Sequence, residues 1–274
     1  MGTDQVFRSA LHEDLRPHPG QAQSAANMLN ALSGSEIVAS HRHGDGVVQD
    51  AYSLRCSPQV HGGARDTIAH AEMVAGRELA SAVDNPVLTV DGRVESNGNF
   101  HGAPVAYVLD FLAIAVADLS SISERRTDRF LDVSRNRKLP AFLAFDPGVD
   151  SGLMIAQYTQ AALVSENKRL AVPASVDSIP SSAMQEDHVS MGWSSARKLR
   201  QAIDNLTKIV GIELMTAARA IDLRAPLHPS PITGAAVAEL RKTSPGPGPD
   251  RFLAPDMQAA VDVVANGTLA KLVK

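Results

Sequence analysis

The sequence predicts an all-α protein, a bundle of long helices with minor short strands, on three observations. Hydrophobic residues make up 44% of the 274 residues but aromatic residues only 4%, so Ala, Leu, Val and Ile must build the core, and Ala and Leu favour helices. Apolar residues step by three and four along several segments, as on one helical face. Pro and Gly cluster between these segments, where helices end. With no internal repeat and no second core, residues 1–274 are expected to form a single helical domain.

The N-terminal part is predicted to hold short helices at residues 7–10 and 21–32, on either side of a Pro-Gly break. A Gly-rich link follows, in which His41, His43 and Asp45 have side chains that can bind a metal. A Gly-rich loop offers these side chains no rigid support, and no third His or Cys stands at a metal-site spacing. We therefore predict no metal site.

The longer helices come next. Residues 67–83 carry apolar side chains roughly on one face, and the helix ends before Pro86, which cannot continue it. Residues 87–92 have strand and turn chemistry, and residues 256–272 are predicted to form a short last helix. Between them, clean apolar spacing predicts long helices over three segments: 104–123, 153–170 and 194–223.

Two features predict the surroundings of the long helices. In the segment 104–123, Phe111, Ile114 and Val116 lie off the main apolar seam, so this helix is expected to be buried on more than one face. Residues 123–126 and 135–138 are runs of charged and polar residues, which are typical of a solvated edge or a subunit contact.

Charge and cysteine content argue against several classes of protein. The net charge is -4, and Lys and Arg are dispersed, which argues against a nucleic-acid surface. The single cysteine, Cys56, excludes an intrachain disulfide and is interpreted as a packing residue of a chain in a reducing cytosol. The most apolar run, residues 111–116, is too short to span a bilayer, and the first residues lack a leader pattern. We expect a cytoplasmic protein without nucleic-acid or membrane partners.

Residues 48–56 are the stretch that most resembles a binding site. Gln49, Tyr52 and Arg55 stand three apart, so one tight helical turn would bring their polar tips to one face. A guanidinium holds a carboxylate through two parallel hydrogen bonds, and a phenol beside a cation releases its proton more readily. Such a face suits an amino-acid substrate. A Tyr and an Arg on a surface turn are also commonly a stacked pair with no chemical role.

Three segments resemble a known family. Residues 49–60, Gln-Asp-Ala-Tyr-Ser-Leu-Arg-Cys-Ser-Pro-Gln-Val, resemble the signature of the histidine ammonia-lyases within the aromatic amino-acid ammonia-lyase family, with Ala51 where the family usually has Pro. The Gly-Asn-Phe-His at residues 98–101 is similar to a second family segment. Residues 178–191, which end in Gln-Glu-Asp-His-Val-Ser-Met, are similar to a third. The resemblance runs over nearly the whole chain.

The resemblance implies both a fold and an activity. The family has a long-helix bundle of the aspartase/fumarase/ammonia-lyase type and forms homotetramers with active sites shared between subunits. It removes ammonia from L-histidine without oxidation to give trans-urocanate. Because no natural side chain is electrophilic, the family uses a methylidene-imidazolone formed autocatalytically from its own Ala-Ser-Gly. No Ala-Ser-Gly occurs here, so the chain resembles roughly the C-terminal half of such an enzyme and is expected to be inactive alone.

The resemblance also implies a role for each of five residues. Arg55 would hold the substrate carboxylate, and Tyr52 would be a catalytic acid–base and polar contact to the electrophile and the reacting amine. Gln49 would support that polar wall, and Phe100 would form an apolar wall. Glu186 would face the imidazole, where a carboxylate binds the ring N–H and favours the charged ring. Each could instead be a buried hydrogen-bonding residue at a subunit contact.

More than one function therefore remains open. The chain is expected to belong to a carbon–nitrogen lyase that acts on L-histidine, with further copies of itself or a missing N-terminal half as partners. The alternative of another class is a non-catalytic helical assembly subunit of the same fold. A phenylalanine or tyrosine ammonia-lyase is the weaker enzymatic alternative, because Glu186 would then be a carboxylate against a plain aromatic ring, buried without a partner.

Overall fold

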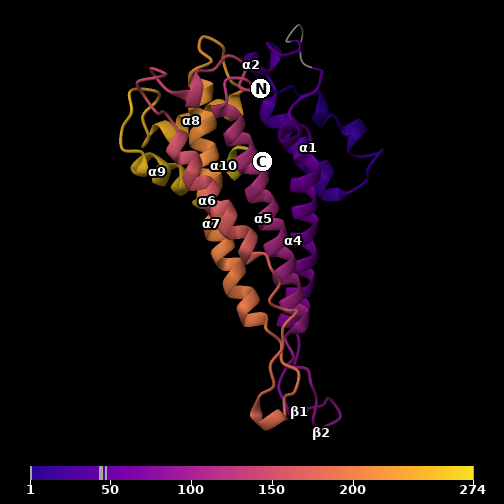
Figure 1. Ribbon diagram of the computed structural model, residues 1–274. Helices are drawn as coiled ribbons and strands as arrows, with labels where there is room; N and C mark the ends of the chain where they lie inside the picture. The colour runs from indigo at the N-terminus through magenta and orange to yellow at the C-terminus, as the bar shows by residue number, and fades with distance from the viewer. Residues whose placement is uncertain (1, 43–45, 47, 274) are drawn as a thin grey trace.

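The protein is a tapering bundle of antiparallel helices, broad at one end and narrow at the other (Figure 1). The computed structural model describes residues 2–42, 46 and 48–273. Long helices run alternately from the broad to the narrow end and back: α4 (Ser57–Leu79), α5 (Ala103–Leu131), α6 (Met154–Leu170) and α7 (Gly192–Asp222). Because α5 packs against each of the other three, it is the central helix of the bundle.

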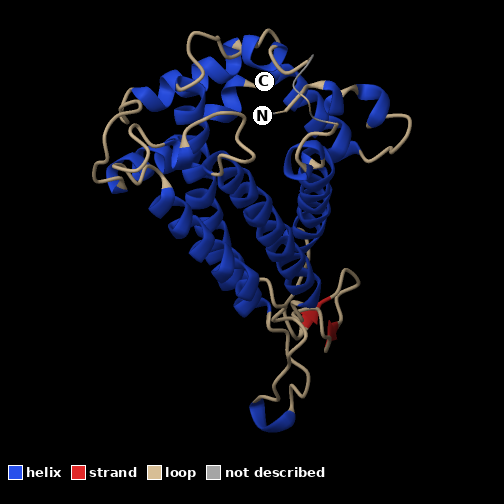
Figure 2. Ribbon diagram, turned by 45° about the horizontal axis from the view of Figure 1, so that its top comes forward, coloured by secondary structure: helices blue, strands red, loops and turns tan. Residues whose placement is uncertain are grey.

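Shorter elements complete the two ends. The broad end carries both ends of the described chain and six helices: α1 (Pro19–Leu32), α2 (Glu36–Ala39), α3 (Tyr52–Arg55), α8 (Pro231–Arg241), α9 (Ala254–Ala265) and α10 (Thr268–Leu272). The narrow end consists of the loops before α5 and α7 and a small antiparallel hairpin, β1 (Val87–Leu88) and β2 (Val94–Glu95), drawn in red in Figure 2. Single 3₁₀ turns lie at Gln5–Phe7, Ser9–Leu11, Ala141–Leu143 and Ser182–Met184.

The predicted all-α bundle with minor strands is confirmed, and α5, α6 and α7 cover the three predicted long segments. The helix predicted at 67–83 is α4, which begins earlier, at Ser57, and ends earlier, at Leu79. Its first turns contain Pro58 and two glycines, which in the sequence alone look like helix breakers. Proline is tolerated in a first turn, where its missing N–H has no partner to lose. A Cβ on Gly62 would lie 2.4 Å from the Cα of Gln21, so this glycine allows α1 and α4 to cross closely.

The C-terminal part differs more from the prediction. Helix α8 was not predicted, although Ser230 and Pro231 form a helix start: the Ser230 hydroxyl accepts the N–H of Thr233 at 3.0 Å. The single helix predicted at 256–272 is two helices, α9 and α10, separated at Gly267. Gly267 has a φ of 70°, which favours glycine and ends the first helix.

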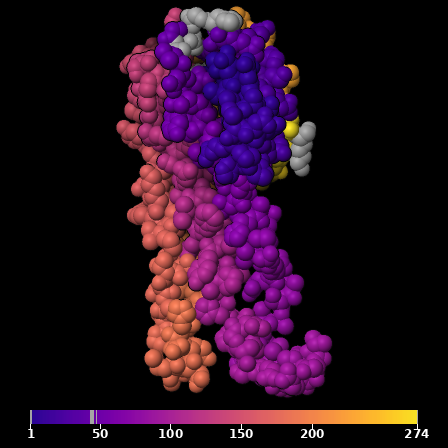
Figure 3. Space-filling view, turned by 90° about the vertical axis from the view of Figure 1, so that its right-hand side faces the viewer, coloured from indigo at the N-terminus to yellow at the C-terminus, as the bar shows by residue number. Residues whose placement is uncertain are grey.

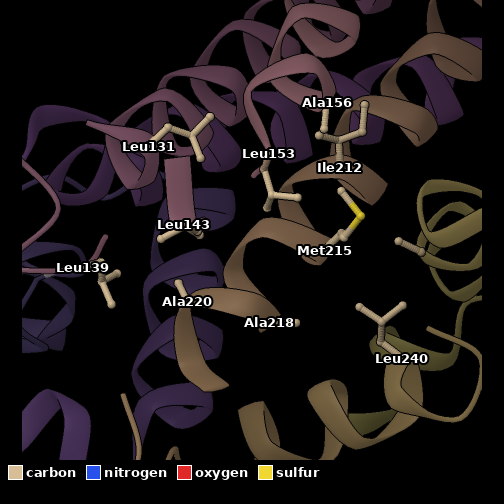
Figure 4. Close-up of a cluster of buried hydrophobic side chains, with 11 residues drawn as sticks. Leu131, Leu139, Leu143, Leu153, Ala156, Ile212, Met215, Ala218, Ala220 and Leu240 are labelled. Carbon is tan, nitrogen blue, oxygen red and sulfur yellow. The ribbon is translucent and has the colours of Figure 1, made fainter. Parts of the chain in front are cut away.

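The main apolar core lies in the broad half, where α5, α6, α7 and α8 meet (Figure 4). Its largest fully buried side chains include Leu143, Leu153, Ile212 and Leu240. Towards the narrow end α5 and α7 pack through smaller residues such as Ala113 and Ala202.

Large apolar side chains are exposed on both α4 and α5. The prediction that α5 is buried on more than one face holds at Val116, which is 8% exposed, and is wrong within one chain at Phe111 and Ile114, which are each 48% exposed. On α4, Ile68 and Met73 are 47% and 45% exposed. Exposed apolar side chains gathered on two neighbouring helices are typical of an interaction surface. By length and composition α5 could also cross a bilayer, but it packs as the core helix of the bundle.

Candidate functional site

Tyr52 and Arg55 lie on α3, a single turn of helix at the broad end. The guanidinium carbon of Arg55 lies 4.7 Å from the centre of the Tyr52 ring, so the two side chains are stacked. Tyr52 is 68% exposed, and Arg55 and Gln49 are also exposed. Gln49 and Arg55 line an open cavity of about 520 Å³. The predicted tight turn is therefore present, and it presents its polar side chains outward rather than to the core of the chain.

The residues before α3 hold it in place. The carboxylate of Asp50 accepts hydrogen bonds from the backbone N–H and the hydroxyl of Thr3, at 2.8 and 2.9 Å. The carbonyl of Ala51 then accepts the N–H groups of Leu54 and Arg55 at 2.9 and 3.0 Å. The site turn is thus tied to the N-terminal segment at its first residues.

Phe100 and Glu186 lie at the narrow end of the molecule. Together with His101, His188 and Trp193 they line a cavity of about 370 Å³. One carboxylate oxygen of Glu186, Oε2, is buried and has no hydrogen-bond partner among the described residues. Burying a carboxylate oxygen without a donor is costly, so this oxygen suits a ligand that brings an N–H or a positive charge.

Two loops meet to form this cavity, and Figure 3 shows them side by side: the loop before α5 in magenta and the loop before α7 in orange. The rings of His101 and His188 stack with centres 5.6 Å apart and planes at 3°. A ring nitrogen of His101, Nε2, is also hydrogen-bonded to the His188 carbonyl at 3.1 Å. Neither histidine was predicted as a site residue from the sequence. His101 directly follows Phe100, and His188 is two residues after Glu186.

The structure does not bring the five predicted residues together within one chain. Gln49, Tyr52 and Arg55 are at the broad end, and Phe100 and Glu186 are at the narrow end. Helix α5 separates the two groups. The part of α5 between Arg126, which contacts α3, and Ala103, its first residue, is about 35 Å long at the usual rise of a helix. No small substrate can touch both groups in one copy.

The described part of the chain contains no group of three side chains that could hold a metal ion. Two of the residues considered from the sequence, His43 and Asp45, lie outside the described residues.

The comparisons with known proteins agree on one family. Residues 1–242 match the family model described as aromatic amino acid lyase. Histidine ammonia-lyase from Streptomyces avermitilis is 70% identical over 270 residues, which are 98% of this chain and 52% of that protein. Histidine ammonia-lyase from Gloeobacter violaceus is 48% identical over 275 residues, which are 100% of this chain and 53% of that protein. The chain thus spans about half the length of the curated relatives it matches.

Solved structures give the same picture. The crystal structure of histidine ammonia-lyase from Trypanosoma cruzi superposes with a TM-score of 0.88 at 42% identity, over 99% of this chain and 51% of that one. A tyrosine aminomutase from Streptomyces globisporus superposes with a TM-score of 0.94 at 36% identity, over 99% of this chain and 55% of that one. The fold is therefore shared by proteins named for different amino acids.

Proposed function

Because this chain belongs to the aromatic amino acid lyase family, we propose that it is part of a histidine ammonia-lyase. Such an enzyme is a carbon–nitrogen lyase that removes ammonia from L-histidine without oxidation and gives trans-urocanate. The observation that carries the choice of histidine is the buried Oε2 of Glu186 in the cavity at the narrow end, which has no hydrogen-bond partner in the described part of the chain. The relatives that are 66–70% identical are named histidine ammonia-lyases, which supports the same choice.

In the proposed site, Arg55 binds the carboxylate of the substrate through two parallel hydrogen bonds. Its stacking on Tyr52 at 4.7 Å holds the planar guanidinium before the substrate arrives, which lowers the ordering cost of binding. The phenol of Tyr52 is next to the carboxylate and reaches the amino group, where it gives or takes a proton. Gln49 adds a polar wall on the same side.

At the other side of the substrate, Glu186 binds the imidazole N–H. The ring then lies against Phe100, which lines the same cavity. A carboxylate next to an imidazole favours the protonated ring, because opposite charges attract at short distance. Phenylalanine or tyrosine would leave this carboxylate without a partner, so histidine is the better fit.

The family's methylidene-imidazolone supplies, when present, the electrophile that makes the amino group a leaving group. No Ala-Ser-Gly occurs in the 274 residues, so in our proposal the group comes from another stretch of polypeptide. Tyr52 suits a contact with that group, because its phenol is exposed, lies beside the cation of Arg55 and is accessible to a neighbouring polypeptide. We place the enzyme in the cytoplasm, where the single free cysteine, Cys56, would stay reduced.

The proposed function is tested by the absorbance of urocanate on adding L-histidine. We expect no product from this chain alone, and product once it is mixed with the N-terminal half of a relative that carries Ala-Ser-Gly. The two chains together are called the complete enzyme below. Urocanate from this chain alone would refute the argument on the missing electrophile. A well-folded complete enzyme that converts phenylalanine or tyrosine but not histidine would support the alternative substrates, and one that converts none would support the assembly subunit.

Since Arg55 and Glu186 lie at opposite ends of the chain, a site that uses both must take them from two copies. We propose a homo-oligomer with shared sites, supported by the exposed apolar side chains of α4 and α5. Co-assembly of an Arg55→Met variant with a Glu186→Gln variant should therefore restore activity in the complete enzyme. Equal mixing gives both native residues in about a quarter of the sites if copies combine at random. Activity no greater than the average of the two separate variants would contradict shared sites.

A further inference from the structure

An ion pair between α5 and α7 lies directly against the site turn. Arg126 on α5 donates from Nε and Nη2 to the two carboxylate oxygens of Glu213 on α7, the second bond at 2.9 Å. The Ser123 hydroxyl donates to the same carboxylate at 2.6 Å. The side chains of Arg126 and Glu213 are only 14% and 19% exposed. Of the two interpretations of residues 123–126, the solvated edge is therefore wrong for Arg126, which points into the bundle, and for the buried Ser123 and Glu124.

The remaining side of the Arg126 guanidinium faces α3. Its Nη1 lies 3.5 Å from the carbonyl oxygen of Ser53 and 3.5 Å from the hydroxyl of Ser57. The Ser57 hydroxyl in turn donates to the Ser53 carbonyl at 2.9 Å. Ser53 lies between Tyr52 and Arg55, so the guanidinium contacts the backbone of the turn that carries both predicted site residues.

A turn of this kind needs such support from outside. Helix α3 has four residues, and a single helical turn is unstable alone because it fixes many dihedral angles for few hydrogen bonds. Tyr52 and Arg55 are exposed, so their own side chains do not anchor it in the core. The carboxylate of Glu213 holds the planar guanidinium at two points, which fixes the direction in which Nη1 points.

The neighbouring titratable groups leave this arrangement intact near neutral pH. Burial lowers the pKa of His61 to about 4, and the charge of Arg126 lowers it too, so this imidazole is uncharged and does not compete for Glu213. Burial raises the pKa of the Cys56 thiol, which therefore stays neutral beside the guanidinium. Neither group therefore adds a charge beside the pair of Arg126 and Glu213.

We propose that Arg126, oriented by Glu213, is a positioning residue that holds the Tyr52–Arg55 turn in its binding geometry. Arg126 touches the backbone of the turn and acts through Tyr52 and Arg55. Its part in catalysis rests on the proposed function, whereas its hold on α3 does not.

The substitution Arg126→Lys separates positioning from general stability. Lysine keeps the charge that pairs with Glu213, but one ammonium group cannot reach the carboxylate and the Ser53 carbonyl with the geometry of a guanidinium. In hydrogen exchange of this chain, we expect the amides of residues 51–57 to exchange about tenfold faster while the melting temperature stays close to that of the unchanged chain. In the complete enzyme, we expect kcat/KM for histidine to fall by about a hundredfold, with KM and kcat both affected.

Two further variants complete the test. Arg126→Met should loosen residues 51–57 and also lower the melting temperature, because Glu213 loses its partner in a mostly buried place. Arg125→Lys is the matched control: Arg125 is the next residue on α5 and is 57% exposed, and lysine keeps a cation beside its partners Glu124 and Asp128. Its exchange at residues 51–57 should equal that of the unchanged chain.

An Arg126→Lys variant with unchanged exchange at residues 51–57 and unchanged kcat and KM would overturn the proposal. So would faster exchange spread over the whole chain, which is the mark of a purely structural role. If the complete enzyme does not act on histidine, the kinetic measurement fails for every variant and the unchanged enzyme alike. The exchange measurement still decides whether Arg126 holds the turn, so the two failures are distinguishable.

Discussion

Arg55→Met in the complete enzyme is expected to lower kcat/KM for histidine by at least about a hundredfold. Methionine fills a similar volume but removes both donors to the substrate carboxylate. A hydrogen bond to a charged group contributes about 1.5–3 kcal/mol, so losing two costs about 3 kcal/mol or more. The stacked contact with Tyr52 also weakens, because its cation is gone. The effect should fall on both KM and kcat, measured by steady-state formation of urocanate.

The control is Arg135→Met, which also removes an arginine near the broad end. Arg135 is 42% exposed and pairs with Asp128 and Asp132, and exposed ion pairs contribute little. Arg55→Lys adds a graded case, because lysine keeps the charge but loses the bidentate geometry. An Arg55→Met enzyme with the kinetics of the Arg135→Met enzyme would remove the carboxylate role from Arg55.

Glu186→Gln is the second change with a large expected effect. Glutamine keeps the shape of glutamate but loses the charge that pairs with a protonated imidazole. The loss of one charged hydrogen bond should cost about 1.5–3 kcal/mol, or roughly tenfold to over a hundredfold in kcat/KM for histidine. Turnover of an amino acid with a plain aromatic ring, where it can be measured, should not fall.

The stability of the same variant should move in the other direction. In the chain alone, Oε2 of Glu186 is buried and has no hydrogen-bond partner among residues 2–42, 46 and 48–273, so a neutral amide is easier to bury there than a carboxylate. We expect a melting temperature equal to or above that of the unchanged chain, together with the lower activity. Asp187→Asn, at the exposed neighbouring position, is the control for loss of one negative charge. A Glu186→Gln enzyme with full activity on histidine would show that Glu186 does not bind the imidazole of the substrate.

The long helices could be predicted from the sequence because their signal is local. The spacing of apolar residues along 194–223 reports a helical face directly, and α7 is found at Gly192–Asp222. The beginning of α4 could not be predicted in this way. In the sequence alone, Gly62 looks like a helix breaker. Its reason appears only where α1 crosses α4, because a Cβ at this position would clash with Gln21.

The burial of Arg126 within the charged run at residues 123–126 could not be predicted for a related reason. Charge predicts exposure only when no partner is near, and the partner of Arg126 is Glu213, far away in the sequence. The same tertiary contact places Arg126 against Ser53 and gives it a role that no local pattern indicates.

The sequence by itself determined the all-α class and the residue types of the candidate site: the phenol, amide and guanidinium of one segment and the aromatic ring and carboxylate of two others. Tertiary structure alone decided where they lie. Successive antiparallel helices carry successive loops to opposite ends, so the turn before α4 is at the broad end and the loops before α5 and α7 are at the narrow end. Tyr52 and Arg55 are therefore separated from Phe100 and Glu186 by the length of α5, and the chain holds two partial sites, because a stiff helix keeps its ends apart.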